Sequence, residues 1–406
     1  MGDAEIMDSR RYWIWLQQCL GEGARFKSII EDFGSVENLY NANIIEWRQS
    51  PELSVTQVER LQKFSIEEAD RIIEECERRK WEIITYDDAL YPQRLREIPN
   101  PPAVLYVDGN ILDMESKCLI AIVGTRKASS YALKAAHIMA KGISRCGAVV
   151  VSGGALGVDS AAHRGAISAN AGTIAVLGCG FATDYLEANR QLREQIKLTG
   201  GALITEFPPH YKATRQSFPL RNRIISGLSK GVLVVEAGVK SGSLITASYA
   251  VEQDRDVYVI PASIFDFNFS GTNKLIDSGA TVATSPSILI ERYTEEFCDL
   301  DMSRAKTVRE LLADEEPRDA NAPIKQQVRF DEITRDRAES VKRQETAFGL
   351  RGNEKTVYEV LNQSFDSVDT ICERAGLDAK SVSIALTMLE MKALVEVASG
   401  KRYRLK

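Results

Sequence analysis

Four short apolar runs within residues 118–250 constrain the fold of this chain more than any other feature. The runs lie at 118–124, 148–154, 173–180 and 231–238, and a helical pattern follows each one at the spacing of a βαβ unit. Uninterrupted apolar runs of this length are typical of parallel strands that helices cover on both faces. The sequence therefore predicts an α/β core built on a mostly parallel sheet.

Each apolar run ends in a loop of small and polar residues that lies directly before a helix. In a parallel sheet these loops gather at the carboxyl edge, where open α/β sheets bind their ligands. Backbone N–H groups and the positive end of a helix dipole attract anions there. The loops and the next predicted helix also carry cations, so we expect a phosphate-binding edge. Its predicted residues are Gly124, Thr125, Arg126, Ser152, Gly153, Gly154, Ala155, Arg221, Arg223, Lys240, Ser241, Gly242 and Ser243.

The loop sequences argue against the common nucleotide-binding motifs. No loop has the G-x-x-x-x-G-K-[ST] pattern of a P-loop, and none has G-x-G-x-x-G with an acidic residue on the following strand. The net charge of the 406 residues is −6. A nucleic-acid ligand would therefore have to bind a local cationic patch, not a generally basic surface.

The composition predicts a cytoplasmic protein without a metal site, a cofactor or a membrane partner. The apolar runs are far too short to cross a bilayer, and the N-terminal residues do not have the pattern of a signal peptide. The seven cysteines form no C-x-x-C pair, which is typical of reduced cysteines and lacks the ligand spacing of zinc sites.

Changes in composition divide the chain into four predicted domains or segments. Residues 1–80 have the apolar stripes of helices, and residues 81–295 contain the α/β core with two extra strands at its start. Residues 296–350 combine dense charge with few large apolar residues, which predicts a largely disordered linker. Residues 351–406 have the order helix, helix, helix, hairpin, which predicts a winged helix. Whether that winged helix contacts DNA or protein remains open at this stage.

The N-terminal helices contain the turn Leu20–Gly23, which is similar to the turn of SAM and helix-hairpin-helix domains. Such a turn can offer backbone N–H groups to a DNA phosphate. The alternative is a helical bundle that packs or dimerises. We favour the bundle because the stretch has no basic cluster.

The core motifs together resemble those of the DNA-processing protein A family, also called DprA or Smf. The matching segments are Gly124–Arg126, Ser152–Ala155, Gly157–His163, Phe218–Ser229 and Ser241–Ala247. The resemblance implies a Rossmann-like core and a homodimer that binds single-stranded DNA during natural transformation. It implies a protein that protects incoming strands and loads the RecA recombinase on them, and that is not an enzyme. It also adds Asn189 and Asn222 to the predicted DNA-binding residues.

One segment departs from the family pattern. Where the family has Tyr-Pro followed by a strand-binding lysine, this chain has Tyr185-Leu186 followed by Glu187. The departure implies weaker DNA binding than is usual in the family, unless Arg190 or Arg193 compensates.

Binding of a single strand requires phosphate contacts and surfaces on which bases stack. The aromatic candidates are Tyr185, Phe207, Phe218 and the loop 265–269. Packing in the core is the alternative for each, and we prefer it for Phe218.

Some polar residues of the motifs also have a purely structural interpretation. One of Arg221 and Arg223 can form an internal salt bridge with Glu206 or Glu236. Asp159 precedes His163 by one helical turn, so a buried Asp–His pair is favoured over catalysis.

Two other function classes are compatible with the sequence. A nucleotide or phosphoribosyl hydrolase would use Glu236 and Asp159 as acid and base, but the chain has no nucleophile–base pair at a recognisable spacing. An assembly platform would use the sheet and the winged helix for protein partners. Such a platform would keep partner binding when Arg126 and Lys240 are replaced.

Overall fold

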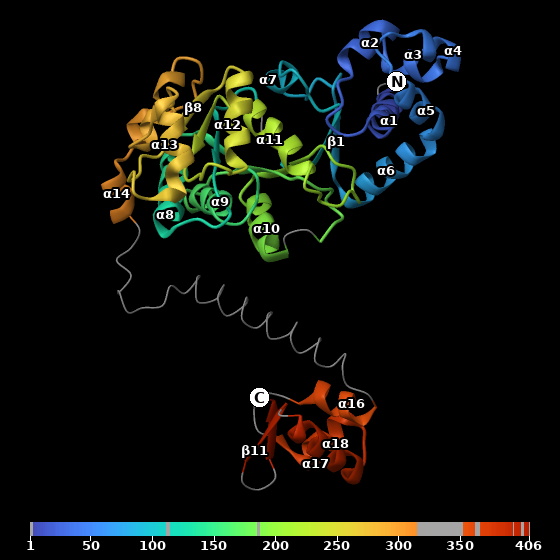
Figure 1. Ribbon diagram of the computed structural model, residues 1–406, viewed down its shortest axis with the longest axis vertical. Coiled ribbons are helices and arrows are strands. Elements are labelled where there is room, and N and C mark those ends of the chain that lie inside the picture. The colour runs from blue at the N-terminus through green and yellow to red at the C-terminus, as the bar shows by residue number, and fades with distance from the viewer. Residues whose placement is uncertain are drawn as a thin grey trace. The chain divides into compact units, whose positions relative to one another are not determined.

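The structure is a computed structural model that describes residues 3–110, 114–184, 187–314, 352–361, 366–392, 394–398 and 402–405. The chain divides into two compact units, Met1–Glu316 and Pro317–Lys406. The first unit contains the N-terminal helices and the α/β core, and the second contains the winged helix (Figure 1).

A nine-stranded sheet of order β1-β2-β6-β5-β4-β3-β7-β8-β9 forms the centre of the first unit. The seven strands from β6 to β9 in this order are parallel, and β1 and β2 add antiparallel strands at the β6 edge. The mostly parallel sheet predicted from the apolar runs is therefore confirmed. The strands are β1 (Glu82–Thr85), β2 (Val104–Gly109), β3 (Leu119–Val123), β4 (Val149–Ser152), β5 (Thr173–Val176), β6 (Ala202–Thr205), β7 (Gly231–Val234), β8 (Asp256–Val259) and β9 (Thr281–Val282).

Helices cover both faces of the parallel strands (Figure 1). One face carries α8 (Ser130–Arg145), α9 (Val158–Ser168) and α10 (Arg190–Leu198), and the other carries α11 (Ser217–Leu228) and α12 (Ser243–Glu252). Alternate residues of each strand point to opposite faces, so two separate apolar cores form. On β3, Ile120 and Ile122 pack with α8 and α9, whereas Ala121 and Val123 pack with α11 and α12. This two-sided burial is the reason that the strands contain no polar alternation.

The helix α11 begins earlier than the sequence predicted. The predicted helix covered 220–229 and left Pro219 in the preceding loop, but α11 already includes Ser217. A proline is tolerated in the first turn of a helix because the N–H group that it lacks would have no partner inside the helix. The remaining short elements of the unit are α7 (Gln93–Arg96), η1 (Glu187–Asn189), η2 (Phe267–Phe269), α13 (Ser270–Asp277), η3 (Pro286–Leu289) and η4 (Glu291–Tyr293).

The strand order reverses between β3 and β7. From β3 the chain proceeds through β4, β5 and β6 in one direction, and it returns on the other side of β3 through β7, β8 and β9. In open α/β folds, ligands bind where the loops that leave two such neighbouring strands diverge to opposite faces of the sheet. The β3–α8 and β7–α12 loops are therefore the place where this fold is expected to bind a ligand.

The N-terminal helices form a bundle with its own apolar core, which includes Trp15, Leu39 and Ile73. The bundle also buries residues of β1 and β2, among them Tyr106. Its helices are α1 (Asp3–Leu20), α2 (Lys27–Phe33), α3 (Val36–Asn41), α4 (Ile44–Gln49), α5 (Val55–Lys63) and α6 (Ile66–Arg79).

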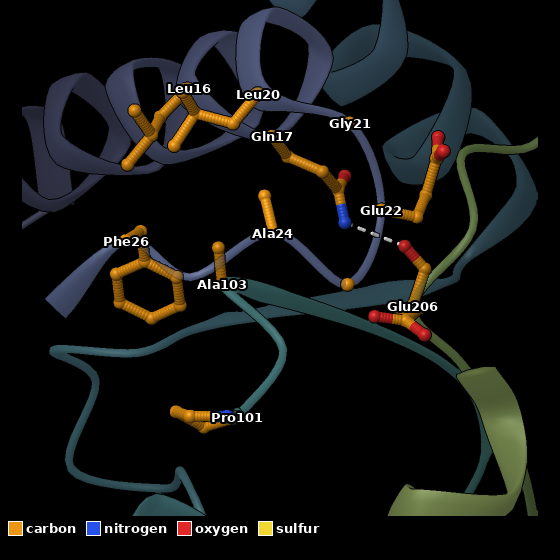
Figure 2. A pocket seen from close by; sticks show the side chains of 11 residues that line it. Leu16, Gln17, Leu20, Gly21, Glu22, Ala24, Phe26, Pro101, Ala103 and Glu206 are labelled. Atoms are coloured by element: carbon orange, nitrogen blue, oxygen red, sulfur yellow. Dashed lines mark hydrogen bonds between the residues drawn. The ribbon is translucent and has the colours of Figure 1, made fainter. Parts of the chain in front are cut away.

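The turn Leu20–Gly23, whose sequence is similar to a turn that contacts DNA in helix-hairpin-helix domains, lies against the α/β core. The Gln17 amide donates to the Glu206 backbone oxygen at 2.6 Å, as Figure 2 shows, and Asn100 donates to the Gly23 oxygen at 2.5 Å. A Cβ on Gly23 would lie 2.6 Å from the Leu220 side chain. The turn thus packs at a domain junction, which supports the bundle interpretation.

The start of the predicted linker differs from the structure. Residues 296–314 belong to the first unit, where they form η5 (Met302–Arg304) and α14 (Val308–Ala313). The side chain of Leu311 is buried, and a Cβ on Gly142 of α8 would lie 3.0 Å from it. Phe297 and Leu300 are buried as well, so apolar side chains dock this segment although it also carries many charges. Residues 315–350 of the predicted linker lie outside the described residues.

The second unit is a small winged helix with its own core. Its helices are α16 (Asn353–Val360), α17 (Val368–Ala375) and α18 (Ala379–Met391), and its sheet has the order β10-β12-β11, with β10 (Asp366–Ser367), β11 (Val395–Ala398) and β12 (Arg402–Leu405). Val382, Leu386 and Leu389 of α18 are buried in that core.

Candidate nucleic-acid interface

The β3–α8 loop carries Arg126 at the carboxyl edge of the sheet, and hydrogen bonds fasten its backbone. The Thr125 N–H donates to the Glu236 backbone oxygen at 2.9 Å, and the Ser129 N–H donates to the Glu236 carboxylate at 3.0 Å. The Ser129 hydroxyl in turn caps α8 by accepting from the Ala132 N–H. The Glu236 carboxylate on the neighbouring strand therefore fastens this loop, while the Arg126 side chain is exposed.

The β4–α9 loop packs tightly beneath the β3 loop because it contains glycines. Gly157 has φ +81°, and a Cβ there would lie 2.4 Å from the Thr125 oxygen. A Cβ on Gly153 would lie 1.9 Å from Nη1 of Arg221 and 2.6 Å from the Asp159 carboxylate. These two positions thus exclude side chains and let the loop, the guanidinium and the carboxylate approach one another.

Asp159 and Arg221 are both buried at this loop, where they hold its shape. Arg221 donates to the Val176 backbone oxygen at 2.6 Å, and the Asp159 carboxylate accepts from the Ala155 N–H at 3.3 Å. Burial raises the pKa of Asp159, and the positive charge of Arg221 offsets part of that rise. The Ala155 N–H, predicted as a phosphate donor, is therefore used inside the loop.

His163 is not paired with Asp159, so the predicted Asp–His pair is wrong. The Nδ1 atom of His163 lies 2.9 Å from the Thr173 hydroxyl, which itself donates to the Val150 oxygen. The hydroxyl must accept from His163, so Nδ1 carries the proton. Burial is the largest cause that lowers the pKa of His163 to about 3, and the charges of Arg164 and Arg221 lower it further. A neutral, fully buried imidazole has a packing role here.

Asn189, which the family resemblance placed among the DNA-binding residues, is also buried. Its amide donates to the Gly154 oxygen at 2.9 Å and to the Ser160 hydroxyl at 3.0 Å. The amide thus positions the β4–α9 loop from η1, and direct contact with DNA would require a conformational change.

The β7–α12 loop leaves the neighbouring strand at the same edge of the sheet. Lys240 is exposed at its tip, and the hydroxyls of Ser241 and Ser243 lie 2.8 Å apart at the start of α12. The amide of Asn222 donates to the Gly242 oxygen at 3.3 Å, which ties α11 to this loop. Lys240 thus lies on the loop after β7 at the same sheet edge as Arg126, which lies on the loop after the neighbouring strand β3.

Arg223 does not belong to the exposed surface, and its predicted role as a phosphate ligand is corrected. Its guanidinium forms two bonds with the Glu206 carboxylate, at 2.7 and 2.6 Å, and its Nε donates to the Asn100 oxygen at 2.8 Å. The side chains of Arg223 and Glu206 are 3% and 1% exposed. This is the internal salt bridge that the sequence analysis raised as an alternative.

Arg126 and Lys240 are the predicted cations that reach solvent, and neither forms an ion pair with a described residue. The Arg126 guanidinium lies 4.6 Å from the centroid of the Phe218 ring. Phe218 is half-buried, so it has the packing role that the sequence analysis preferred and also supports the arginine. Phe207 is fully buried and cannot stack with a base, and Tyr185 lies outside the described residues.

Sequence analysis omitted three exposed cations of the same edge. Lys127 follows Arg126, and Lys212 and Arg215 lie in the loop between β6 and α11. The sequence contained the signal for all three cations. Each one lies in a loop that follows a predicted parallel strand, and such loops gather at the carboxyl edge of the sheet.

The two carboxylates of the hydrolase alternative are inaccessible. Glu236 is 1% exposed and accepts from Ser129, and Asp159 is 7% exposed and holds the β4–α9 loop.

Among the residues that the structure describes, no group of three or more His, Cys, Asp or Glu side chains is placed to hold a metal ion.

Comparison with known families gives the decisive match. Residues 82–294 match the model described as DNA recombination-mediator protein A, and residues 341–401 match a DprA winged helix domain. The chain belongs to the DNA recombination-mediator protein A family. The resemblance seen in the core motifs and the winged helix predicted for the C-terminal domain are both confirmed.

Relatives of this DNA recombination-mediator family cover most of the chain. Protein Smf of Synechocystis is 32% identical over 399 residues, which are 97% of this chain and 98% of that protein. DNA processing protein DprA of Bacillus subtilis is 42% identical over 51% of this chain and 72% of that protein. The crystal structure of DprA from Streptococcus pneumoniae matches with a TM-score of 0.58 and 31% identity, over 71% of this chain and 98% of that one.

At η1 this chain has Glu187 where the family pattern has a lysine, and the structure shows what this acidic side chain contacts. The Glu187 carboxylate lies 3.4 Å from the Arg190 guanidinium. Arg190 was a candidate to compensate for the missing lysine, but its charge is already partly balanced by Glu187. Tyr185 and Leu186 lie outside the described residues.

The third helix of the winged helix exposes apolar side chains. Ile384, Met388 and Met391 recur at helical spacing on the outer face of α18, and all three are exposed. Lys392 is paired with Glu354. This face therefore favours protein contact over DNA binding.

In the described part of the chain, no helix combines the length and apolar character that a transmembrane segment needs.

Proposed function

We propose that this chain binds single-stranded DNA at the carboxyl edge of its sheet. The observation that carries the proposal is the position of Arg126 and Lys240, which are exposed on the two loops of the topological switch point. Two separate loops, each with an exposed cation shortly before a helix N-terminus, suit consecutive phosphates of one strand. The names of relatives, which describe DNA processing, support the same ligand class.

The shape of the edge favours a single strand over a duplex. The cations lie on short loops at a sheet edge, and the helices α8 and α12, which begin after these loops, pack along the sheet; a major groove is usually read by a helix that enters it. The contacts offered are to phosphates and, through nearby aromatic rings, to base faces, which are the contacts of sequence-tolerant single-strand binders. The hydrolase alternative has no supporting observation, because Glu236 and Asp159 are buried. We infer that the protein acts by binding and not by catalysis.

The finer function rests on the family. We propose that the chain protects single-stranded DNA taken up during natural transformation, loads RecA on it and works as a homodimer in the cytoplasm. Recombinase loading is tested by filament formation on strands that are already coated with single-strand-binding protein, with and without this chain. The homodimer is tested by sedimentation of the full chain.

Fluorescence anisotropy of a labelled oligo-dT, with its duplex as competitor, tests DNA binding directly. Arg126→Ala and Lys240→Ala should each weaken binding and lower the salt slope by about 0.7 per lost phosphate contact. Lys63→Ala, an equal change of charge at the exposed end of α5, is the matched control and should bind as the wild type does. Wild-type affinity in both site variants would refute this site.

A further inference from the structure

The loop that follows β8 exposes large apolar side chains without a partner in the described structure. Ile264 is 78% exposed, and Phe265 and Phe267 are each 84% exposed. Two phenylalanines at such exposure, two residues apart, are unusual because burial of aromatic rings is strongly favourable. The feature indicates a ligand that covers the rings.

The backbone of this loop is held in place, so the rings are presented on a defined support. The Ser263 hydroxyl accepts from the Phe265 N–H at 3.2 Å, and the Ser270 hydroxyl donates to the Phe267 oxygen at 2.7 Å. Phe269, which follows them, is buried in the core and anchors the segment. The exposure of Phe265 and Phe267 is therefore built into the turn.

The same loop is joined to both walls of the proposed DNA site. The N–H groups of Gly271 and Thr272 donate to the Ala237 oxygen, at 2.8 and 3.2 Å, in the loop that carries Lys240. On the other side, the Tyr131 hydroxyl of α8 donates to the Pro261 oxygen at 2.9 Å. Tyr131 lies in the first turn of α8, directly after the loop of Arg126, and it is 52% exposed. The segment that carries the exposed rings is thus hydrogen-bonded both to the loop of Lys240 and to the first turn of α8.

We propose that Phe265 and Phe267, with Tyr131 beside them, are a stacking ledge for the bases of a strand whose phosphates Arg126 and Lys240 bind. The inference rests on the proposed function and adds the residues that contact bases. Neighbouring parallel strands lie roughly 4.8 Å apart, so the ledge on the β8 loop begins one strand away from Lys240. Rings next to exposed cations match a nucleic-acid strand, which is charged along its backbone and has an aromatic face on every base.

The test compares two oligonucleotides that carry the same phosphates. One is a labelled dT strand, and the other has the same length with abasic sites throughout. The variant is the full chain with Phe265→Ala and Phe267→Ala. Leu198→Ala, at an 85% exposed position at the end of α10, is the control for loss of an exposed apolar side chain.

The double variant should bind the dT strand about five- to a hundredfold more weakly for each stacked base that is lost. It should bind the abasic strand as the wild type does, and its salt slope should not change because no phosphate contact is removed. A variant with Phe265→Trp and Phe267→Trp should bind the dT strand as tightly as the wild type does. The Leu198→Ala control should match the wild type on both strands.

Two outcomes separate failure of the ledge from failure of the proposed function. If wild-type protein binds the dT strand and the double variant binds it equally well, the ledge is refuted while the phosphate site stands. If the wild type binds neither strand, the proposed function fails and the ledge with it. A variant that binds DNA normally but changes its mass in light scattering would show that the rings form a contact between copies of the chain, which also refutes the ledge.

Discussion

At the scale of single residues, three arginines that the chain places close together have different roles because they differ in burial. Arg126 is exposed on a loop, Arg221 supports the β4–α9 loop from within, and Arg223 is paired with Glu206 at the domain junction. Arg221 and Arg223 are two positions apart on one helix, so they point about 200° apart around its axis. Their chemistry is identical, and only the neighbours of each guanidinium decide whether it stabilises the fold or is available to a ligand.

Replacement of Arg223 should therefore affect folding. Arg223→Met leaves the Glu206 carboxylate buried without its partner, which should lower the free energy of unfolding by about 3–5 kcal/mol. Urea unfolding followed by circular dichroism measures the loss. The matched variant Arg126→Met should unfold as the wild type does but bind oligo-dT more weakly. If Arg223→Met keeps full stability and loses only DNA binding, the structural role of this residue is refuted.

His163 should make stability depend on pH in the acid range. Its pKa is about 3 in the folded protein and 6.5 in the reference state, so between these values the unfolded chain binds more protons. Stability should then fall as the pH drops from 6.5 toward 3, by about 1.4 kcal/mol per pH unit once the unfolded imidazole is charged. Asp159 contributes with the opposite sign because its folded pKa is raised.

Comparison with His163→Leu isolates this contribution of the histidine. The variant should show a shallower decline of the unfolding free energy between pH 6.5 and 3, whatever its stability at neutral pH. Urea unfolding at a series of pH values gives both curves. Parallel curves would mean that the imidazole takes up a proton as readily in the folded protein as in the unfolded chain.

At the scale of elements, the candidate site depends on the close approach of two loops, and glycine makes that approach possible. Gly157 has a positive φ, and a Cβ added to it would lie only 2.4 Å from the Thr125 oxygen. The β3 loop, which carries Arg126, cannot keep its position if that Cβ is added. Loop packing and presentation of the cation are therefore one structural feature.

Gly157→Ala should weaken oligo-dT binding and lower the thermal midpoint. The backbone at Gly157 has φ +81° and ψ −127°, a conformation that costs a residue with a Cβ about 1–3 kcal/mol, and displacement of the β3 loop adds to this cost. Gly200→Ala is the matched control, because Gly200 has φ +79° but no atom within 4 Å of the added Cβ. The control should lose stability and keep its DNA affinity. Equal DNA affinity in the two variants would show that the loop contact does not position Arg126.

At the scale of the whole molecule, the proposed DNA site and the winged helix belong to different compact units. The first unit contains all of the candidate site, and the second has its own apolar core around Leu386. The exposed apolar face of α18 has the chemistry of a protein contact and lacks the cations of a phosphate-binding surface.

A fragment of residues 1–314 should therefore bind oligo-dT much as the full chain does. We expect its affinity and its salt slope to agree with those of the full chain within about a factor of two, because every phosphate contact that we propose is retained. Anisotropy titrations at several salt concentrations compare the two proteins. A clearly smaller salt slope in the fragment would assign phosphate contacts to the winged helix.

The sequence by itself determined the parallel sheet, its carboxyl edge, the winged helix and the two cations Arg126 and Lys240. These features depend on local patterns, since apolar runs specify covered strands and small residues before a helix specify a tight loop. Only the tertiary structure decided that Arg223 and Asn189 are buried, that His163 bonds to Thr173, and that residues 296–314 dock on the core. Each of these outcomes depends on side chains brought together from distant parts of the chain, and no spacing along the sequence encodes which of them become neighbours.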